Sequence, residues 1–358
     1  MKKIFMRVFS LLLCLFQSIT FLSCSNTFYD GEIMSDDSTS ASAQKESSTI
    51  ESINDSEEKT EDTGSEKENQ EKVDLNGKKI LIIGNSYVFY GRTTLYTATA
   101  VRDQISRSGD KGFFYQLCKE NGYDVSVTNW TFSGHGLYDL CDTPCTHSAC
   151  KGGIIHEDAL IDPVYDYVVI SPGGGDLSEK YFVENFDHLC KFFRAANPNV
   201  KIVCLGNLGA HGYSSFGTVE PGICSHYKNL EKQGVIIADW GGLVNGIIDG
   251  IYKVPGATQK YSAKTFIVKD GYHPNPLAGY ITTLMAYCAI TGESPIGQPY
   301  DFCTDKTINV KFDMVDYISD YYVNGNTNFL DVFQSESDML GIQQLIAQYL
   351  KNKPYLMA

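Results

Sequence analysis

Two hydrophobic patterns alternate along residues 76–358. Short apolar runs, rich in Val and Ile and without polar alternation, are typical of strands buried on both faces of a parallel sheet. Longer segments between them are typical of helices. The predicted strands are 79–83, 124–131, 165–171, 200–205 and 235–239, and the predicted helices are 113–121, 179–196, 276–291 and 339–351. This order predicts an α/β domain in which helices cross over between parallel strands.

Small residues follow the first three predicted strands. The strand 79–83 runs into the turn 84–86 (Gly-Asn-Ser), and the later turns are 133–136 (Ser-Gly-His-Gly) and 172–176 (Pro-Gly-Gly-Gly-Asp). Open α/β sheets bind ligands at the carboxyl ends of their strands. We therefore expect these turns to border one site.

Ser86 stands in the first of these turns and is a candidate nucleophile. A serine hydroxyl reacts poorly unless a base takes its proton. Far downstream, Asp270 and His273 are three residues apart in a loop stiffened by Pro274. A carboxylate can hold an imidazole through its Nδ1, so His273 is the candidate base and Asp270 the orienting acid.

Each of these three residues also has a purely structural interpretation. Ser86 could be a helix N-cap at the end of the strand. Asp270 could cap the following turn, and His273 could be a surface residue that precedes a helix. Their combination favours the catalytic interpretation, because a serine, a base and an orienting acid are what acyl transfer requires.

The ordered turns, followed by Asp270-x-x-His273, resemble the conserved blocks of the SGNH (GDSL-like) hydrolases over about residues 78–295. The resemblance implies a flavodoxin-like three-layer sandwich with a central parallel sheet, the SGNH hydrolase fold. It also implies that Ser86 is the nucleophile, served by His273 and Asp270. The backbone N–H groups of Ser86 and Gly134 would point at the oxyanion. Members of the family are mostly esterases, lipases, thioesterases and carbohydrate deacetylases, and their chemistry needs no metal and no cofactor.

Gly175 departs from the family pattern. At this position the family usually has an asparagine whose side chain donates to the oxyanion. Loss of one such donor costs roughly a hundred- to a thousand-fold in rate. Either His135 or a backbone N–H of residues 173–175 replaces the donor, or the site is slow or inactive.

The amino terminus predicts export and a lipid anchor. Three basic residues precede an apolar run, 8–22, that is too short and wrongly flanked for a retained membrane span. The run ends just before Cys24, and this resembles a bacterial lipoprotein signal in which Cys24 becomes the lipidated residue. The alternative is a plain secreted protein. We expect a signal peptide over 1–23 and an extracytoplasmic protein that meets a bacterial membrane by its lipid anchor only.

Residues 24–75 are predicted to form a disordered acidic tether before a hydrolase domain at 76–358. Positions 31–75 hold 14 acidic and 4 basic residues, which accounts for −10 of the net charge of −14. So few large apolar residues cannot offset the entropy of ordering this segment. The domain shows no basic patch, so nucleic acid is not an expected partner.

The chain has 11 cysteines, of which one lies in the signal and one is the lipidation candidate. Nine remain, so at least one is unpaired. Cys204 and Cys288 fall in a predicted strand and a predicted helix and are expected to be free core thiols. Cys141, Cys145 and Cys150 form a dense cluster that could be a disulfide, a zinc site or free thiols. Disulfide ranks first, because the spacing matches no common zinc motif.

The aromatic residues after Ser86 leave two interpretations open. Tyr87, Phe89 and Tyr90 could line an acyl or sugar pocket, or they could pack in the core. The pattern as a whole predicts a surface-anchored serine esterase that acts on a small-molecule or glycan ester, for example an O-acetyl group.

Two other function classes compete with the esterase. A non-catalytic carbohydrate-binding protein that retains the SGNH fold is favoured by Gly175. A metal-binding surface protein could be built around residues 141–150. The acyl part, the alcohol part and the oligomeric state have no signature in the sequence.

Overall fold

The computed structural model describes the residues that form the globular part of the chain. They are residues 72–94, 112–131, 136–137, 160–161, 164–173, 179–206, 208, 222–268, 271, 273–304 and 335–356. All belong to one compact unit, Lys67–Ala358. The expected signal peptide, Cys24 and the tether up to residue 71 lie outside them. Within the described residues, no helix has the length and apolar character needed to span a membrane.

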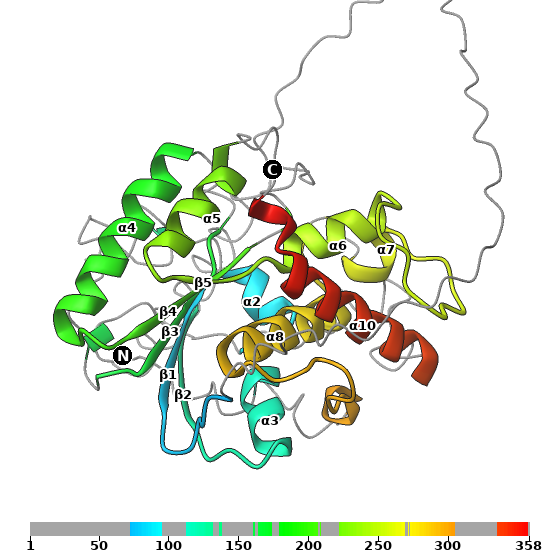
Figure 1. Ribbon diagram of the computed structural model, residues 1–358, viewed down its shortest axis with the longest axis horizontal. Helices are drawn as coiled ribbons and strands as arrows, with labels where there is room; N and C mark the ends of the chain where they lie inside the picture. The colour runs from blue at the N-terminus through cyan, green and yellow to red at the C-terminus, as the bar shows by residue number, and fades with distance from the viewer. Residues whose placement is uncertain are drawn as a thin grey trace, which may run out of the picture. The chain divides into compact units, whose positions relative to one another are not determined.

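A parallel sheet lies at the centre of the fold (Figure 1). Among the described residues it has five strands, in the order β2-β1-β3-β4-β5, and each neighbouring pair is parallel. The strands are β1 (Lys79–Gly84), β2 (Ser126–Thr131), β3 (Tyr167–Ile170), β4 (Lys201–Leu205) and β5 (Ile236–Ala238). This is the flavodoxin-like order of a doubly wound sheet, so the expected fold class is confirmed.

Helices cover both faces of the sheet. They are α2 (Ser86–Tyr90), α3 (Phe113–Glu120), α4 (Glu179–Ala196), α5 (Gly222–Lys232), α6 (Trp240–Ile248), α7 (Ala263–Phe266), α8 (Pro276–Thr291) and α10 (Glu336–Asn352). Short 3₁₀ helices follow α8 and α10, at Asp301–Thr304 and Pro354–Leu356. Figure 1 shows α4 and α5 on one face and α3, α8 and α10 on the other. The domain therefore has three layers.

The helix α8 is the centre of its layer. Nearly all of its residues are buried, and it contacts α3, α6, α10 and the strands β4 and β5. A helix that is hydrophobic all round needs cover on every side. Its ends are well defined, because the Asn275 side chain accepts from the Ala278 N–H at 3.1 Å and Gly292 closes the helix in the left-handed conformation.

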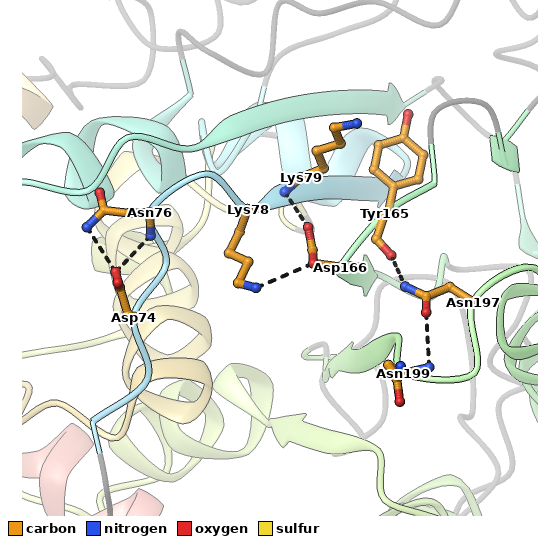
Figure 2. A network of polar contacts seen from close by, with 8 residues as sticks. All are labelled: Asp74, Asn76, Lys78, Lys79, Tyr165, Asp166, Asn197 and Asn199. Carbon is orange, nitrogen blue, oxygen red and sulfur yellow. Dashed lines mark hydrogen bonds and ion pairs between the residues drawn. The ribbon is translucent and has the colours of Figure 1, made fainter.

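Polar contacts tie the strands together at the amino-terminal edge of the sheet (Figure 2). The Asp166 carboxylate accepts from the backbone N–H of Lys79 at 2.9 Å and lies 3.5 Å from Nζ of Lys78. The Asn197 side chain, after the end of α4, donates to the Tyr165 carbonyl at 2.8 Å. The ion pair is partly exposed and contributes little to stability. The hydrogen bonds to the Lys79 N–H and to the Tyr165 carbonyl therefore define where β1 and β3 begin.

The folded unit begins before the expected boundary at residue 76. Leu75 is fully buried in the core, and the N–H of Val73 donates to the Thr291 carbonyl at 3.0 Å. Asn76 then accepts from the Asp124 N–H at 2.9 Å. Val73 and Leu75 follow an acidic segment, so the sequence pattern does not set them apart from the tether. The last residues assigned to the tether therefore belong to the domain.

We predict that Leu75→Ala destabilises the domain, because it leaves a cavity in a fully buried site. The free energy of unfolding should fall by about 2–4 kcal/mol. Denaturant unfolding measures this loss. Lys72→Ala, at an exposed position three residues earlier, is the control and should change the stability by no more than about 0.5 kcal/mol. Equal stability of the two variants would contradict the placement of Leu75.

Candidate active site

Gly84 allows β1 to turn directly into α2. A Cβ at this position would lie 2.2 Å from Cγ2 of Val88 and 3.1 Å from Cβ of Ser171. The neighbouring strand stays paired to this point, because the Ser171 N–H donates to the Ile83 carbonyl at 2.9 Å. Glycine is therefore required by close approach, and the turn is held against the end of β3.

Ser86 is the first residue of α2, and Asn85 is its N-cap. Asn85 has extended backbone angles, and its side chain accepts from the Tyr87 N–H at 3.1 Å. Asn85 and Ser86 are both buried, with 3% and 8% of their surface exposed. The cap that the sequence offered as an alternative role for Ser86 is thus made by its neighbour. The Ser86 hydroxyl is not needed to begin the helix.

This position is the switch point of the sheet. From β1 the chain goes first to β2 on one side and then to β3 on the other, because β1 lies between them. Doubly wound sheets bind their ligands outside the carboxyl ends of the strands at such a point. The turn that carries Ser86 therefore occupies the place where a ligand site is expected.

His273 is held by a hairpin-like loop that precedes α8. The Val268 N–H donates to the His273 carbonyl at 2.9 Å, and Ile267 pairs with Pro274 in an antiparallel bridge. Gly271, with φ of 87°, donates its N–H to the Val268 carbonyl at 2.9 Å and closes the loop. Glycine suits this left-handed position. The pairing fixes the backbone of His273 on both sides.

The His273 ring packs on α2. It stacks on Tyr90 with the ring centroids 3.9 Å apart and the planes 7° apart. Tyr87 lies on a second side, at 5.8 Å and 52°. Both tyrosines belong to the helix that Ser86 begins, so the structure brings the expected base to the helix of the expected nucleophile. Only 7% of the surface of His273 is exposed.

Two glycines set the distance between α2 and α8. A Cβ on Gly279 would lie 1.4 Å from the carbonyl oxygen of Gly91, and a Cβ on Gly91 would lie 2.9 Å from Cα of Gly279. The Thr93 hydroxyl also donates to the Gly279 carbonyl at 3.4 Å. Since Gly91 is the C-cap of α2 and α8 begins soon after His273, this backbone contact holds the two candidate residues in one frame.

A small hollow lies beside the turn of Ser86. It is lined by Ile83, Gly84, Asn85, Trp130, Gly136, Leu137 and Ser171. These residues come from the ends of β1, β2 and β3 and from the segment that follows the expected oxyanion donor Gly134. The segment after the second strand therefore reaches the same edge as the candidate nucleophile.

Several expected site residues lie outside the described residues. They are Asp270, Gly134, His135, Gly175 and the cysteine cluster at 141–150. Among the residues that are described, no group of three His, Cys, Asp or Glu side chains is placed to hold a metal ion.

The described cysteines do not compete with Ser86 as nucleophiles. Cys118, Cys190, Cys204, Cys288 and Cys303 are free and buried, which confirms the expectation for Cys204 and Cys288. Burial raises the pKa of the Cys118 thiol to about 12, with a smaller contribution from Glu293. Burial also raises the pKa of Cys204 well above its usual value. Protonated thiols of this kind are poor nucleophiles.

Comparison with known proteins gives matches among solved structures. No family model matches this chain. No curated protein matches it either. A protein described as a GDSL-like lipase from Parabacteroides merdae is 17% identical, with a TM-score of 0.44, over 62% of this chain and 98% of that chain. A catalytic mutant of an acetylxylan esterase from Geobacillus stearothermophilus is 16% identical, with a TM-score of 0.42, over 61% and 96%.

A third similar structure, of the protein TesA, is 18% identical with a TM-score of 0.37, over 60% of this chain and 98% of that chain. The SGNH/GDSL-like resemblance predicted from the motifs is thus found again among solved structures. At these identities and TM-scores the matches do not by themselves assign an activity to this chain.

We predict that Gly279→Ala is among the most damaging small substitutions in the domain. Its Cβ would overlap the Gly91 carbonyl, so α2 and α8 must separate. The free energy of unfolding should fall by several kcal/mol, beyond the 1–3 kcal/mol typical of overpacking, as measured by denaturant unfolding.

The control for this prediction is Gly250→Ala. Gly250 has a positive φ of 75° and nothing within 4 Å of an added Cβ. The free energy of unfolding of Gly250→Ala should fall only by the roughly 1–2 kcal/mol expected for an L-residue in the left-handed region. If Gly279→Ala lost no more than Gly250→Ala, the helices would not be held by backbone contact.

Proposed function

We propose that this protein is a serine ester hydrolase of the SGNH type, with Ser86 as its nucleophile. One observation carries the proposal: the His273 ring packs on the helix that Ser86 begins, at the switch point of the sheet. Asn85 supports it, because it caps the helix in place of Ser86. A serine at the start of α2 and a histidine whose ring packs on that helix, at the ligand edge of a doubly wound sheet, fit acyl transfer.

In the proposed reaction His273 takes the proton of the Ser86 hydroxyl while Oγ attacks the acyl carbon. The backbone N–H groups of Ser86 and Gly134 donate to the oxyanion of the tetrahedral intermediate. Asp270 orients the imidazole and stabilises its charged form. His273 then gives the proton to the leaving alcohol. Water attacks the acyl-serine with His273 again as base, which releases the acid and restores Ser86.

The proposed substrate is an ester with a short acyl group, such as an O-acetyl group on a glycan. The hollow beside the Ser86 turn, lined in part by Ile83, Trp130 and Leu137, leaves no room for a long acyl chain. Lipidation at Cys24, on the outer side of a bacterial membrane, would hold the enzyme near surface polysaccharides. Both points are part of the proposal.

A second candidate is a carbohydrate-binding protein that keeps the fold without turnover. It is favoured by Gly175, which takes the place of the usual oxyanion donor. The two candidates differ in one measurement, the hydrolysis of a chromogenic acetate ester by the purified chain. Hydrolysis that depends on Ser86 supports the esterase, and binding of an acetylated glycan without hydrolysis supports the second candidate.

We predict that Ser86→Ala and His273→Ala each abolish hydrolysis of p-nitrophenyl acetate to a similar extent. The double variant should lose little more, because residues that act as a unit are not additive. Initial rates at neutral pH, with unfolding curves for each variant, test the prediction.

Ser126→Ala is the matched control for this prediction. Ser126 is the exposed first residue of β2, at the opposite edge of the sheet, so its loss should leave the rate unchanged. Full activity of Ser86→Ala would exclude this serine as the nucleophile. Additive losses in the double variant would place His273 in a different site.

We predict that Gly175→Asn raises kcat with little change in KM. An asparagine amide at this position would add a donor that acts mainly in the transition state. An aligned donor is worth on the order of 3 kcal/mol, and the gain should be smaller because nothing has evolved to support the side chain. Steady-state kinetics of parent and variant measure it. An unchanged or lower kcat in a folded variant would indicate that another group, with His135 first to test, already replaces the donor.

A further inference from the structure

Tyr90 lies one helical turn after Ser86 on α2. Residues four apart share one face of a helix, so the tyrosine ring and the serine hydroxyl are on the same side. Tyr90 is buried, with 4% of its surface exposed. Its ring faces the His273 imidazole almost in parallel, at 3.9 Å between centroids. This short helix therefore carries both the candidate nucleophile and a flat surface under the candidate base.

We propose that Tyr90 is a positioning residue for the His273 imidazole. This inference rests on the proposed function and adds a residue to it. A ring stacked face to face cannot rotate about its χ2 bond without losing that contact, and Tyr87 bounds its second side at 5.8 Å. The backbone of His273 is already fixed by its pairing with Val268. The phenol ring then fixes the plane of the imidazole, in which both ring nitrogens lie.

The position of Tyr90 is itself well defined. It is the last residue of α2, and the next residue is Gly91, whose carbonyl abuts Gly279 on α8. The backbone that carries the ring therefore moves only if the two helices move. A positioning group must be held by its own surroundings to hold another group, and this contact supplies the support.

The stacking also favours the reaction electrostatically. When His273 takes the serine proton it becomes an imidazolium, and the face of an aromatic ring attracts a cation. The attraction is absent from the neutral ground state and present as charge develops. An interaction that is stronger in the transition state raises kcat and has little effect on KM.

Three substitutions in the full chain separate positioning from core packing. Tyr90→Phe keeps the aromatic face, Tyr90→Leu removes it, and Phe89→Leu is the matched control. Phe89 is the adjacent residue of α2 and is equally buried, and its ring packs 5.3 Å from Tyr90. Tyr90→Met replaces Tyr90→Leu if the latter does not fold.

With p-nitrophenyl acetate, we expect Tyr90→Phe to stay within about twofold of the parent in kcat. Tyr90→Leu should lose roughly 5- to 50-fold in kcat with KM nearly unchanged. Phe89→Leu should be less stable and yet retain the parent kcat. Rescue by phenylalanine and the split between kcat and KM are not expected of a residue that only fills space.

A second measurement does not depend on activity. In histidine-labelled protein, the Hε1 signal of His273, assigned by its loss in His273→Ala, should lie upfield because of the ring current of Tyr90. The signal should move downfield in Tyr90→Leu and stay in place in Tyr90→Phe. No movement in Tyr90→Leu would overturn the proposal.

The kinetic outcomes distinguish the two levels of inference. If the parent hydrolyses the ester and Tyr90→Leu matches it in kcat, the role of Tyr90 is overturned and the proposed function stands. Equal kcat losses in Tyr90→Leu and Phe89→Leu would also overturn it. If the parent hydrolyses no ester, the proposed function fails, and the catalytic role of Tyr90 fails with it.

Discussion

The contact between the backbones of Gly91 and Gly279 is the constraint on which the candidate site depends. It joins the end of α2 to the first turn of α8, with no side chain between them. Ser86 begins the first of these helices, and His273 precedes the second. The two residues are distant in the sequence, and their separation in the fold is set by one close approach. A larger residue at either position would push them apart.

The sheet and α8 supply the rigid surroundings for that contact. After their exposed first residues, β1, β2 and β4 are buried on both faces, which is why their apolar runs do not alternate. The Gly84 turn then lies against Ser171, just after the end of β3. Catalytic groups on such elements are held more narrowly than groups on long loops. The backbone of the loop that carries His273 is restrained in a similar way, because the Val268 N–H donates to the His273 carbonyl.

The elements predicted well from the sequence are those with local signals. The helix α8 begins and ends as predicted, because Asn275 and Pro276 mark its start and Gly292 its end. The helix α4 likewise stops where Asn197 and a proline follow. Such signals act within a few residues, so a single sequence is enough to identify them.

Two of the features that were missed differ in cause, because one had a local signal and the other had none. Helix α6 contains three glycines and is capped by Asp239, which the apolar pattern placed in the fifth strand. Asp239 is fully buried, accepts from the Gly242 N–H at 3.2 Å, and also accepts from the Tyr349 hydroxyl of α10 at 2.7 Å. The aspartate before a helix was a usable signal. In contrast, no local pattern indicates that Tyr90 stacks on His273, because that contact follows from how α2 meets α8.

The chain enters the domain at the edge of the sheet opposite the candidate site. Residues 74–79 join the sheet at its amino-terminal edge, beside the contacts drawn in Figure 2, and β1 carries the chain from there to the Ser86 turn. Anything that holds the protein through residues before Lys72 therefore pulls on the edge opposite the candidate site.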